Sequence, residues 1–489
     1  METVDKRPAA VRHGKVQVSG SPGSRGHHGS PGSPGTTPGE KPRRRILVVG
    51  GGQVGTHTAL HLQRGLRREV ARGEVEIVVL TPDPYMTYQP FLPEAAAGSI
   101  SPRHAVVPLR RVLHRCRIVV GTVRSVDHAA RTATLTPPST ARTAPGPETL
   151  RYDELVLVPD AVPGTLPVPG LAEHGIRLTT VEEAVALRNH VVAQLDLASS
   201  TRDPDLRAAA LTFVVVGGRY TSVAALGELE DMTRYATRHH PTVWPEDLTW
   251  ILVEASDRVL AEAGPELGAY AVRELRRRNV DVRLRTRLDS CTDRVAVLDD
   301  GSRVNTRTVV WTASGRPHPV LAATGLPRDE HGRLICTARL TVDGVPHAWA
   351  AGDAAAVPDT AAGTGAFDAR HAVGQARVLA GNLVAALRGT PLTEYAPART
   401  AAVAPLGLHR GVAQVRGRYL KGYPAWFMHR LHHLSRVPTV QRRARVLAEW
   451  AVSGLFAREV TSLGSPAHPG ADPASTAQGP CPRRPNGSI

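Results

Sequence analysis

RRILVVGGGQVGTHTALHL, residues 44–62, is the stretch that decides the fold. Its apolar run ends at three consecutive glycines, and a helix-forming segment follows. A short continuous apolar run predicts a buried strand of a parallel sheet. Gly50, Gly52 and Gly55 fill the pattern G-x-G-x-x-G, which predicts a dinucleotide-binding turn when it joins a strand to a helix.

The residues of this turn have separate physical roles. Gly50 permits the tight turn, Gly52 lets the backbone approach a pyrophosphate, and Gly55 lets the helix pack closely on the strand. Gln53 and Val54 begin the helix, whose N-terminus presents backbone N–H groups and a partial positive charge to phosphates. We therefore expect these five residues to bind a dinucleotide cofactor.

The acid that would bind the ribose is not at its expected position. Thr81 stands at the end of the second predicted strand, and Asp83 follows two residues later. Asp83 can reach round to the ribose or can be an ordinary turn aspartate, and both interpretations stay open. Further along, Gly352 and Asp353 follow another predicted strand, in AAGDAAAVPD. In two-domain flavoproteins an aspartate at this place accepts a hydrogen bond from the ribityl chain, so this pair is a second cofactor-binding candidate.

A second strand–turn–helix unit begins in FVVVGGRYTSVAALGEL, residues 213–229. Gly217 and Gly218 keep its turn, but Arg219 and Ser222 stand at the second and third glycine positions. The predicted strands YDELVLVPDA and HAWAAGDAAAV belong with the first unit, and LTWILVEAS, VDVRLRTRLDSC and TRTVVWTAS belong with the second. Because the first unit resumes after the second, the sequence predicts an α/β fold of two nested, doubly wound domains.

Composition excludes several classes of protein. The 489 residues hold no run of 18 apolar residues, and the N-terminus lacks the apolar core of a secretory signal, so we expect neither a spanning helix nor export. Four cysteines lie far apart in the sequence, which argues against a metal knuckle and a redox dithiol and favours a cytosolic location. The formal net charge of +16 fits nucleic acid, an anionic membrane surface, or no charged partner at all.

Motifs outside the two glycine turns are more specific. They read PYMTYQPFLPEAAAGSISPRH, VVPLRRVL, YDELVLVPDA, VVWTASG, AWAAGDAAA and LKGYPAWFMHRLHHLSRVPT. Together with ILVVGGGQVG they make the chain resemble the type II NADH dehydrogenases, the single-subunit NADH:quinone oxidoreductases, and in particular their actinobacterial relatives. The resemblance covers about residues 44–463. It implies non-covalently bound FAD that takes a hydride from NADH and passes electrons to a membrane quinone of the menaquinone type.

The resemblance implies a division of the chain. An FAD-binding domain would occupy residues 43–175 and 315–400, around an NADH-binding-like Rossmann domain at 176–314. Residues 401–463 would form a basic, amphipathic region at the membrane surface. Residues 1–42 and 464–489 are rich in Gly, Ser and Pro, and we predict that these tails are disordered.

The resemblance also implies functions for single residues. FAD contacts carry over to Gly50, Gly52, Gly55 and Asp353. The family's ribose-binding acid corresponds to Glu254. Its carboxylate would accept hydrogen bonds from both ribose hydroxyls of NADH and repel a 2′-phosphate. No residue is assigned a catalytic role, and no metal is expected.

Three departures from the family pattern fall on the sites. Arg219 replaces the glycine that faces the pyrophosphate, and its side chain can push the phosphates away or swing outward and pair with one. Ala224 replaces a glutamate that lies near the flavin in the family and is implicated in its proton and quinone chemistry. Asp160 replaces a glycine, and beside the FAD pyrophosphate it would add like-charge repulsion.

Two further motifs are altered. Ser314 replaces a glycine, with Gly315 one residue late. The quinone-side motif A-Q-x-A-x-Q reads ARHAVG at residues 369–374, without either glutamine, although Gln375 follows. Two functions of different classes therefore remain: a type II NADH dehydrogenase, whose NADH binding is either intact or weakened, and a non-catalytic or redirected FAD-binding paralogue.

The basic C-terminal stretch carries Trp426, Phe427, Trp450 and Phe456. These aromatic residues can lie at a membrane interface, with basic residues at anionic headgroups, or they can pack on the core. The resemblance favours a peripheral protein on the inner face of the cell membrane, with NADH and quinone as substrates. No nucleic-acid-binding motif accompanies the charge, and a homodimer is left open.

Overall fold

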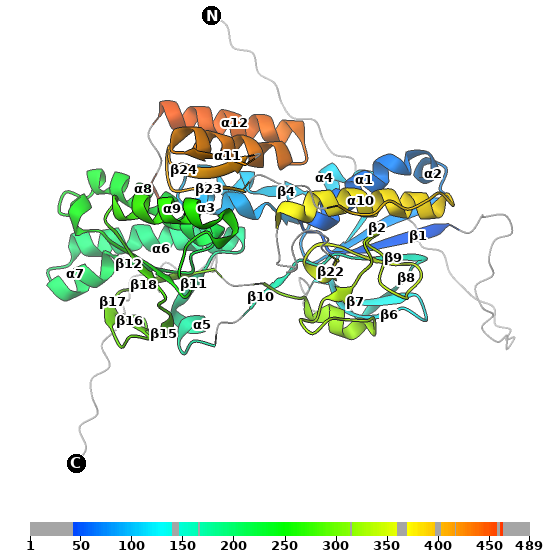
Figure 1. Cartoon of the computed structure of the whole chain (residues 1–489), viewed down its shortest axis with the longest axis horizontal. Coiled ribbons are helices and arrows are strands. Elements are labelled where there is room, and N and C mark those ends of the chain that lie inside the picture. The colour runs from blue at the N-terminus through cyan, green and yellow to red at the C-terminus, as the bar shows by residue number, and fades with distance from the viewer. Residues whose placement is uncertain are drawn as a thin grey trace, which may run out of the picture. The chain divides into compact units, whose positions relative to one another are not determined.

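The computed structural model describes residues 43–138, 146–164, 167–312, 315–358, 369–396, 402–415, 417–456 and 460–462. The predicted tails and Ser314 lie outside these ranges. From Arg43 onward the chain forms one unit, whose elements are labelled in Figure 1.

The first sheet is built around the strand that precedes the glycine turn. All four strand pairs are parallel, and the order is β21 (Ala348–Ala350), β9 (Glu154–Leu157), β1 (Arg44–Val49), β2 (Val75–Thr81) and β5 (Arg117–Val120). The apolar residues of β1 are buried on both faces. Figure 1 shows α1 (Gln53–Gly65) and α10 (Ala369–Leu387) on one face. The other face carries the antiparallel strands β6 (Thr122–Asp127), β7 (Thr132–Thr136) and β8 (Glu148–Arg151).

The second sheet is also parallel throughout. Its order is β11 (Gly175–Arg177), β18 (Thr308–Trp311), β12 (Thr212–Val216), β13 (Thr249–Glu254) and β14 (Val280–Leu284). Its long helices are α6 (Val181–Ser200), α8 (Tyr220–Ala236) and α9 (Pro265–Arg276). Two short strands, β10 (Val162–Pro163) and β19 (Gly315–Arg316), lie in the two segments that connect the sheets. They pair with each other in an antiparallel way. The α/β prediction with two Rossmann-like sheets is confirmed, while the domain limits stay a prediction.

One predicted strand is wrong. VDVRLRTRLDSC forms two strands in different sheets: β14 in the parallel sheet, and β15 (Leu288–Cys291) in an antiparallel sheet with β16 (Val295–Leu298) and β17 (Arg303–Asn305). The chain turns between them at Arg285, which has a φ of 55°. A left-handed residue cannot continue a strand, and nothing in the alternation of this stretch marks that position.

The remaining elements are short. The helices are α2 (Arg67–Ala71), α3 (Leu92–Ala96), α4 (Leu109–Val112), α5 (Leu171–His174) and α7 (Pro204–Ala210). The 3₁₀ turns are η1 (Gln89–Phe91), η2 (Pro102–His104), η3 (Thr237–His239), η4 (Pro245–Asp247), η5 (Ala261–Ala263), η6 (Pro319–Thr324) and η7 (Gly352–Ala354). The strands are β3 (Tyr85–Thr87), β4 (Val106–Pro108), β20 (Leu334–Ile335) and β22 (Ala355–Ala356).

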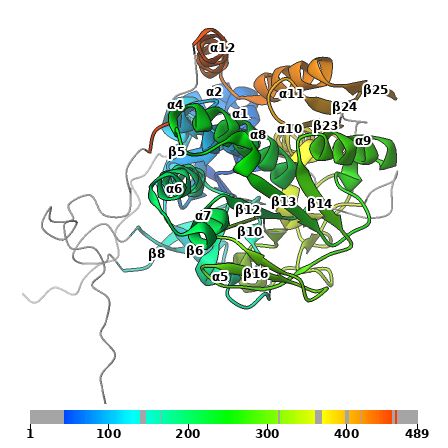
Figure 2. The same ribbon diagram turned by 90° about the vertical axis from the view of Figure 1, so that its left-hand side faces the viewer.

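The C-terminal region is a small antiparallel sheet covered by two helices, gathered on one side of the unit in Figure 2. It consists of β23 (Ala402–Pro405), β24 (Gly411–Val415), β25 (Arg418–Lys421), α11 (Tyr423–Arg436) and α12 (Val440–Leu455). None of the described helices is both long and apolar enough to span a membrane.

Part of the aromatic pattern in this region serves packing, which corrects the sequence prediction. Trp426 is only 6% exposed. The Arg430 guanidinium lies 4.1 Å from the ring centre of Trp426 and 4.8 Å from that of Trp450. Trp450 Nε1 donates to the Glu94 carboxylate of α3 at 2.9 Å. A guanidinium between two aromatic faces is attracted by both, so this cluster holds α11 and α12 on the core.

Two glycines form a matched pair for testing how tightly α1 packs. A Cβ on Gly55 would lie 2.0 Å from the carbonyl oxygen of Gly50, whereas a Cβ on Gly381 of α10 would meet nothing within 4 Å. We expect Gly55→Ala to lower the free energy of unfolding by about 1–3 kcal/mol, because the backbone must move. Gly381→Ala should raise it by about 0.5–1 kcal/mol, since alanine favours a helix. Chemical denaturation measures both, and changes of the same sign would contradict the packing.

Candidate functional site

A cavity of about 750 Å³ collects residues from both parallel sheets and from the C-terminal region. Gly50, Gly52 and Gln53 line it from the first glycine turn, and Arg219 and Tyr220 line it from the start of α8. It also reaches Asp160, Asp353, Thr81 and Asp83, and His432, His433 and Arg436 of α11. The cavity therefore contains the N-termini of two helices that each follow a glycine turn.

The first turn has the geometry that the sequence predicts. Gly50 has a φ of 121°, and a Cβ there would lie 2.2 Å from the carbonyl oxygen of Val158. Val54 and Gly55 lie behind the lining and are buried. Helix α1 has no side-chain cap and no acidic residue in its first turn. Among the described residues no side chain caps these first N–H groups, and they suit a phosphate.

Gly352 and Asp353 lie beside this turn. Gly352 packs against Val54 and donates its N–H to Gln375 Oε1 at 2.7 Å. Asp353 Oδ2 accepts from the Ala161 N–H at 3.1 Å. Burial raises the pKa of Asp353, and the Ala161 N–H opposes that shift. Asp353 lines the cavity, so its carboxylate can accept from a ribityl hydroxyl.

Asp160 occupies the space in front of Gly52. A Cβ on Gly52 would lie 1.8 and 2.0 Å from its two carboxylate oxygens. Asp160 is exposed to the open cavity, but desolvation by the protein packed around it raises its pKa to about 7, and the charge of Asp353 adds to the shift. A protonated carboxyl can donate to a phosphate oxygen, whereas the ionised form repels it. With the uncapped helix, and with the Asp160 carboxyl protonated or turned aside from Gly52, these residues fit FAD, whose isoalloxazine would supply the hydride chemistry.

The second turn differs in how its N–H groups are used. The Gly218 N–H donates to Glu254 Oε2, and the Ser256 N–H donates to Glu254 Oε1 at 2.7 Å. The first N–H of α8, that of Tyr220, donates to Glu262 Oε1 at 3.0 Å. The Glu262 carboxylate therefore binds a helix N–H where a pyrophosphate would be expected, while Glu254, predicted to bind the ribose, is hydrogen-bonded to the turn itself. The residues predicted for this second site, Gly217, Gly218 and Glu254, do not line the large cavity.

The altered positions near α8 have distinct surroundings. Arg219 is exposed, and no side-chain hydrogen bond caps the helix there. Ser222 is fully buried, and its hydroxyl lies 2.5 Å from that of Thr312. Ala224 is buried as well. Ser222 thus fits the place of the third glycine, while the choice between repulsion and pairing at Arg219 stays open.

The remaining candidates are placed as follows. Thr81 and Asp83 both line the cavity, and the Thr81 hydroxyl donates to the Asp83 carbonyl at 3.1 Å, so both roles of Asp83 stay open. At the altered quinone-side motif, His371 Nδ1 lies 2.9 Å from the Tyr395 hydroxyl. The side chain of Arg370 lies outside the described residues.

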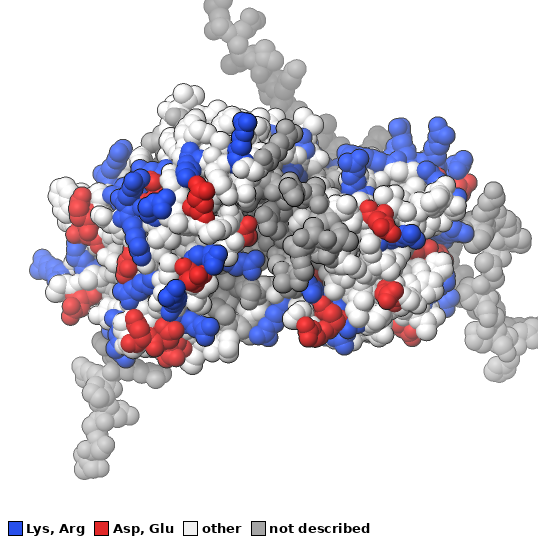
Figure 3. All heavy atoms as spheres, in the orientation of Figure 1, with Lys and Arg blue, Asp and Glu red and all other residues white. Residues whose placement is uncertain are grey.

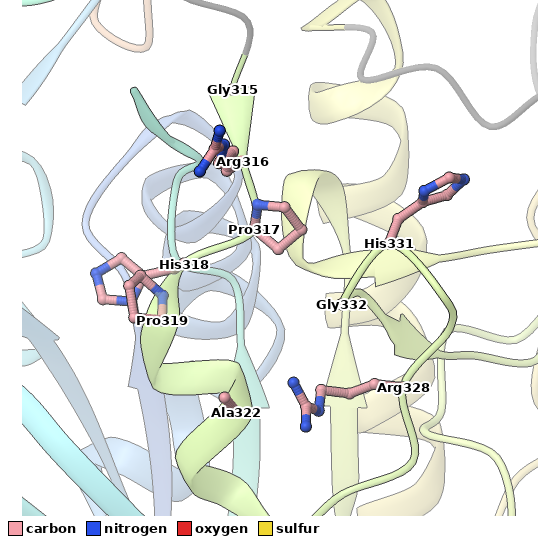
Figure 4. Close-up of a pocket in the computed structure, with 9 residues that line it drawn as sticks. All are labelled: Gly315, Arg316, Pro317, His318, Pro319, Ala322, Arg328, His331 and Gly332. Carbon is pink, nitrogen blue, oxygen red and sulfur yellow. The ribbon is translucent and has the colours of Figure 1, made fainter. Parts of the chain in front are cut away.

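A second cavity, of about 480 Å³, lies at β19 and η6. Figure 4 shows Arg316 and Arg328 on the two segments that border it, together with His318 and His331. No α-helix begins among its lining residues. The larger cavity, with its two helix N-termini, is therefore the candidate dinucleotide site.

Residues 44–376 match the family model of the pyridine nucleotide-disulphide oxidoreductases. This chain belongs to that family. Its members are oxidoreductases, which agrees with two Rossmann-like sheets that open onto one cavity.

Several relatives carry a more specific name. The chain is 27% identical over 427 residues to the type II NADH:quinone oxidoreductase NdhA of Mycobacterium tuberculosis, covering 84% of this chain and 87% of that protein. It is 26% identical over 394 residues to the type II NADH:quinone oxidoreductase of Staphylococcus aureus, covering 79% and 93%. These relatives confirm the resemblance that the motifs indicate.

Solved structures agree on the fold. NDH2 from Plasmodium falciparum has a TM-score of 0.76 to this chain at 13% identity, and the match covers 86% of this chain and all of that one. A second structure of that protein, in complex with NADH, has a TM-score of 0.75.

The position of Asp160 predicts a pH-dependent affinity for FAD. The carboxyl gains charge as the pH rises through about 7, so FAD affinity should fall, by about tenfold between about pH 6 and pH 8. Asp160→Asn should remove this dependence, and Asp289→Asn, an exposed aspartate of β15, should keep it. Fluorescence titration of the apoprotein with FAD measures it. The same pH dependence in both variants would contradict the assignment.

Because Glu262 binds the first N–H of α8 and Glu254 binds the Gly218 N–H, we expect these two carboxylates to weaken NADH binding. Glu262→Gln keeps an acceptor but removes the charge, so NADH affinity should rise about three- to tenfold. The double change Arg219→Gly, Ser222→Gly should raise it ten- to a hundredfold, because charge-assisted bonds to phosphate are worth about 1.5–3 kcal/mol each. Calorimetry measures both, with Glu246→Gln, exposed on η4, as the control. If Arg219→Gly alone weakens binding, Arg219 is a phosphate ligand.

Proposed function

We propose that this protein is an FAD-dependent NADH:quinone oxidoreductase of the type II class. FAD would lie at Gly50, Gly52, Gly55 and Asp353, and NADH would approach from the turn at Gly217 and Gly218. A membrane quinone of the menaquinone type would accept the electrons. The observation that carries the proposal is the shared cavity, because a hydride donor and its acceptor must meet in one place.

One observation favours a second candidate, a redirected FAD-binding paralogue. In the part of the chain that the structure describes no side chain caps α1, although the Asp160 carboxyl lies against Gly52, whereas Glu262 binds the first N–H of α8 and Glu254 binds Gly218. An NADH pyrophosphate would have to replace or lie beside these acids. The FAD half of the site is therefore better supported than the NADH half.

Anaerobic mixing with NADH separates the two candidates. The purified protein should be yellow, and NADH should bleach the flavin absorbance, slowly if the acids at α8 weaken binding. A naphthoquinone added afterwards should restore the colour. A yellow protein that dithionite bleaches but saturating NADH does not would overturn the first candidate and support the second. A colourless protein that FAD cannot reconstitute would exclude both.

The C-terminal helices carry the surface that we propose for the membrane. In α12, Val440, Leu447 and Leu455 are 79%, 51% and 80% exposed, and their spacing places them on one helix face. Phe427 and Phe456 are exposed too. In Figure 3, Lys and Arg side chains are spread over the visible face among Asp and Glu. The exposed apolar residues of α12 therefore indicate the position of the membrane contact more clearly than the distribution of charge does.

Liposome binding tests this surface. The double change Leu447→Glu, Leu455→Glu should reduce binding to anionic liposomes by about tenfold or more, because apolar area is lost and negative charge is added. Trp244→Glu, at an exposed apolar residue far from α12 in the sequence, is the control. Rising salt should release the unmodified protein. Unchanged sedimentation with liposomes after removal of residues 416–460 would contradict the proposal. A position on the inner face of the cell membrane and a homodimer stay predictions.

A further inference from the structure

Four side chains from three segments form one hydrogen-bonded chain. The Tyr88 hydroxyl lies 3.0 Å from His433 Nδ1, and His433 Nε2 lies 3.1 Å from the Tyr220 hydroxyl. The Tyr220 hydroxyl also bonds to His429 Nε2. The order is thus Tyr88, His433, Tyr220, His429, which runs from the loop after β3 through α11 to the start of α8 and back to α11.

Burial keeps all four groups neutral. It raises the pKa values of Tyr88 and Tyr220, lowers the pKa of His433, and lowers that of His429 to about 3. Other charged and titratable groups face these four side chains. They are Glu94 of α3, Glu228 of α8, and Arg430, His432 and Arg436 of α11.

Each neutral member can both donate and accept a proton. Tyrosine has one O–H and lone pairs, and neutral histidine has one N–H and one acceptor nitrogen. The chain can therefore be drawn with every bond running from Tyr88 toward His429 or with every bond reversed. One proton moved along each bond, with one released at one end and one taken up at the other, converts one pattern into the other. His429 Nδ1 is buried and has no hydrogen-bond partner among the described residues. This end of the hydrogen-bonded series can therefore accept one more proton.

The chain lies at the candidate site. Tyr88, Tyr220 and His433 line the large cavity. A set of proton-carrying groups therefore borders the cavity.

We propose that Tyr88, His433, Tyr220 and His429 form a proton relay for the reduction of a quinone bound in this cavity. The inference rests on the proposed function. A quinone needs two electrons and two protons to become a quinol. A hydride equivalent from reduced FAD accounts for both electrons and one proton, so one proton must come from the protein.

The relay supplies that proton without any oxidation of its members. The Tyr88 O–H proton goes to the quinol oxygen, and His433 Nδ1 gives its proton to Tyr88. Tyr220 gives its proton to His433 Nε2, and His429 Nε2 gives its proton to Tyr220. His429 Nδ1 takes up a proton from a water molecule, which must first penetrate to this buried nitrogen. Only N–H and O–H bonds break and form, and one proton from solvent is consumed.

Stopped-flow reoxidation tests the relay independently of NADH. The FAD-loaded full-length protein is reduced with dithionite without oxygen and mixed with a water-soluble naphthoquinone. Tyr220→Phe and Tyr88→Phe each remove one hydroxyl, and Tyr235→Phe makes the same change elsewhere on α8. We expect at least tenfold slower reoxidation in the first two, since a positioned proton donor contributes about 10²–10⁴-fold, and no more than twofold in the third.

The solvent isotope effect and the dependence on an added buffer acid separate a relay from a docking contact. The unmodified protein should reoxidise more slowly in D₂O, and Tyr220→Phe should become dependent on the concentration of an added buffer acid. If Tyr220→Phe only lowers the melting temperature, the four residues merely hold α11 against α8, and the relay is wrong. If the unmodified protein is not reoxidised by quinone at all, the proposed function fails as well, which is a distinct result.

Histidine NMR gives a readout that needs no turnover. In ¹⁵N-histidine-labelled protein, His429 and His433 are identified by the signals that His429→Gln and His433→Gln remove. Both should remain neutral at about pH 6, because burial lowers their pKa values. Their tautomer populations should change in Tyr220→Phe but not in Tyr235→Phe. Imidazolium signals at about pH 6, or no change in Tyr220→Phe, would overturn the relay.

Discussion

Two helices begin at one cavity, and each leaves backbone N–H groups that need an acceptor. Helix α1 begins at a bare glycine turn without a side-chain cap. Helix α8 begins at a similar turn, but its first N–H is bound by Glu262, and Gly218 is bound by Glu254. The same structural unit thus lacks a side-chain cap in one case and binds carboxylates of the chain in the other. If these carboxylates exclude NADH, this difference would separate an NADH:quinone oxidoreductase from a redirected flavoprotein.

The fold could be predicted from the sequence because its signals are local. Gly50, Gly52 and Gly55 act through spacing along a few residues, and buried parallel strands are visible as apolar runs. Glu262 is 42 residues from Tyr220, and Tyr88 is 345 residues from His433. No periodicity links such pairs, so the acids at α8 and the tyrosine–histidine chain could be found only from the tertiary structure. Composition also could not show that Trp426 faces the core while Phe427 faces outward.

The C-terminal region completes the site as well as offering a surface. Arg430 between Trp426 and Trp450, with Trp450 bonded to Glu94 of α3, holds α11 in place. That position brings His429 and His433 to Tyr220 and Tyr88. The packing of three aromatic and basic side chains therefore sets the geometry of a hydrogen-bonded network on the same buried face of α11.

Helix α11 has two faces with opposite surroundings. Tyr423, Phe427 and Leu431 recur every four residues and are exposed, while His429 and His433 are buried on the far side. An α-helix with its side chains is about 10–12 Å across. If the exposed face rests on lipid, the bilayer and the cavity are separated by the thickness of one helix. A water-insoluble substrate would then partition from the membrane into the protein along the edge of α11, and its concentration in the lipid, rather than in bulk water, would govern how often the cavity is filled.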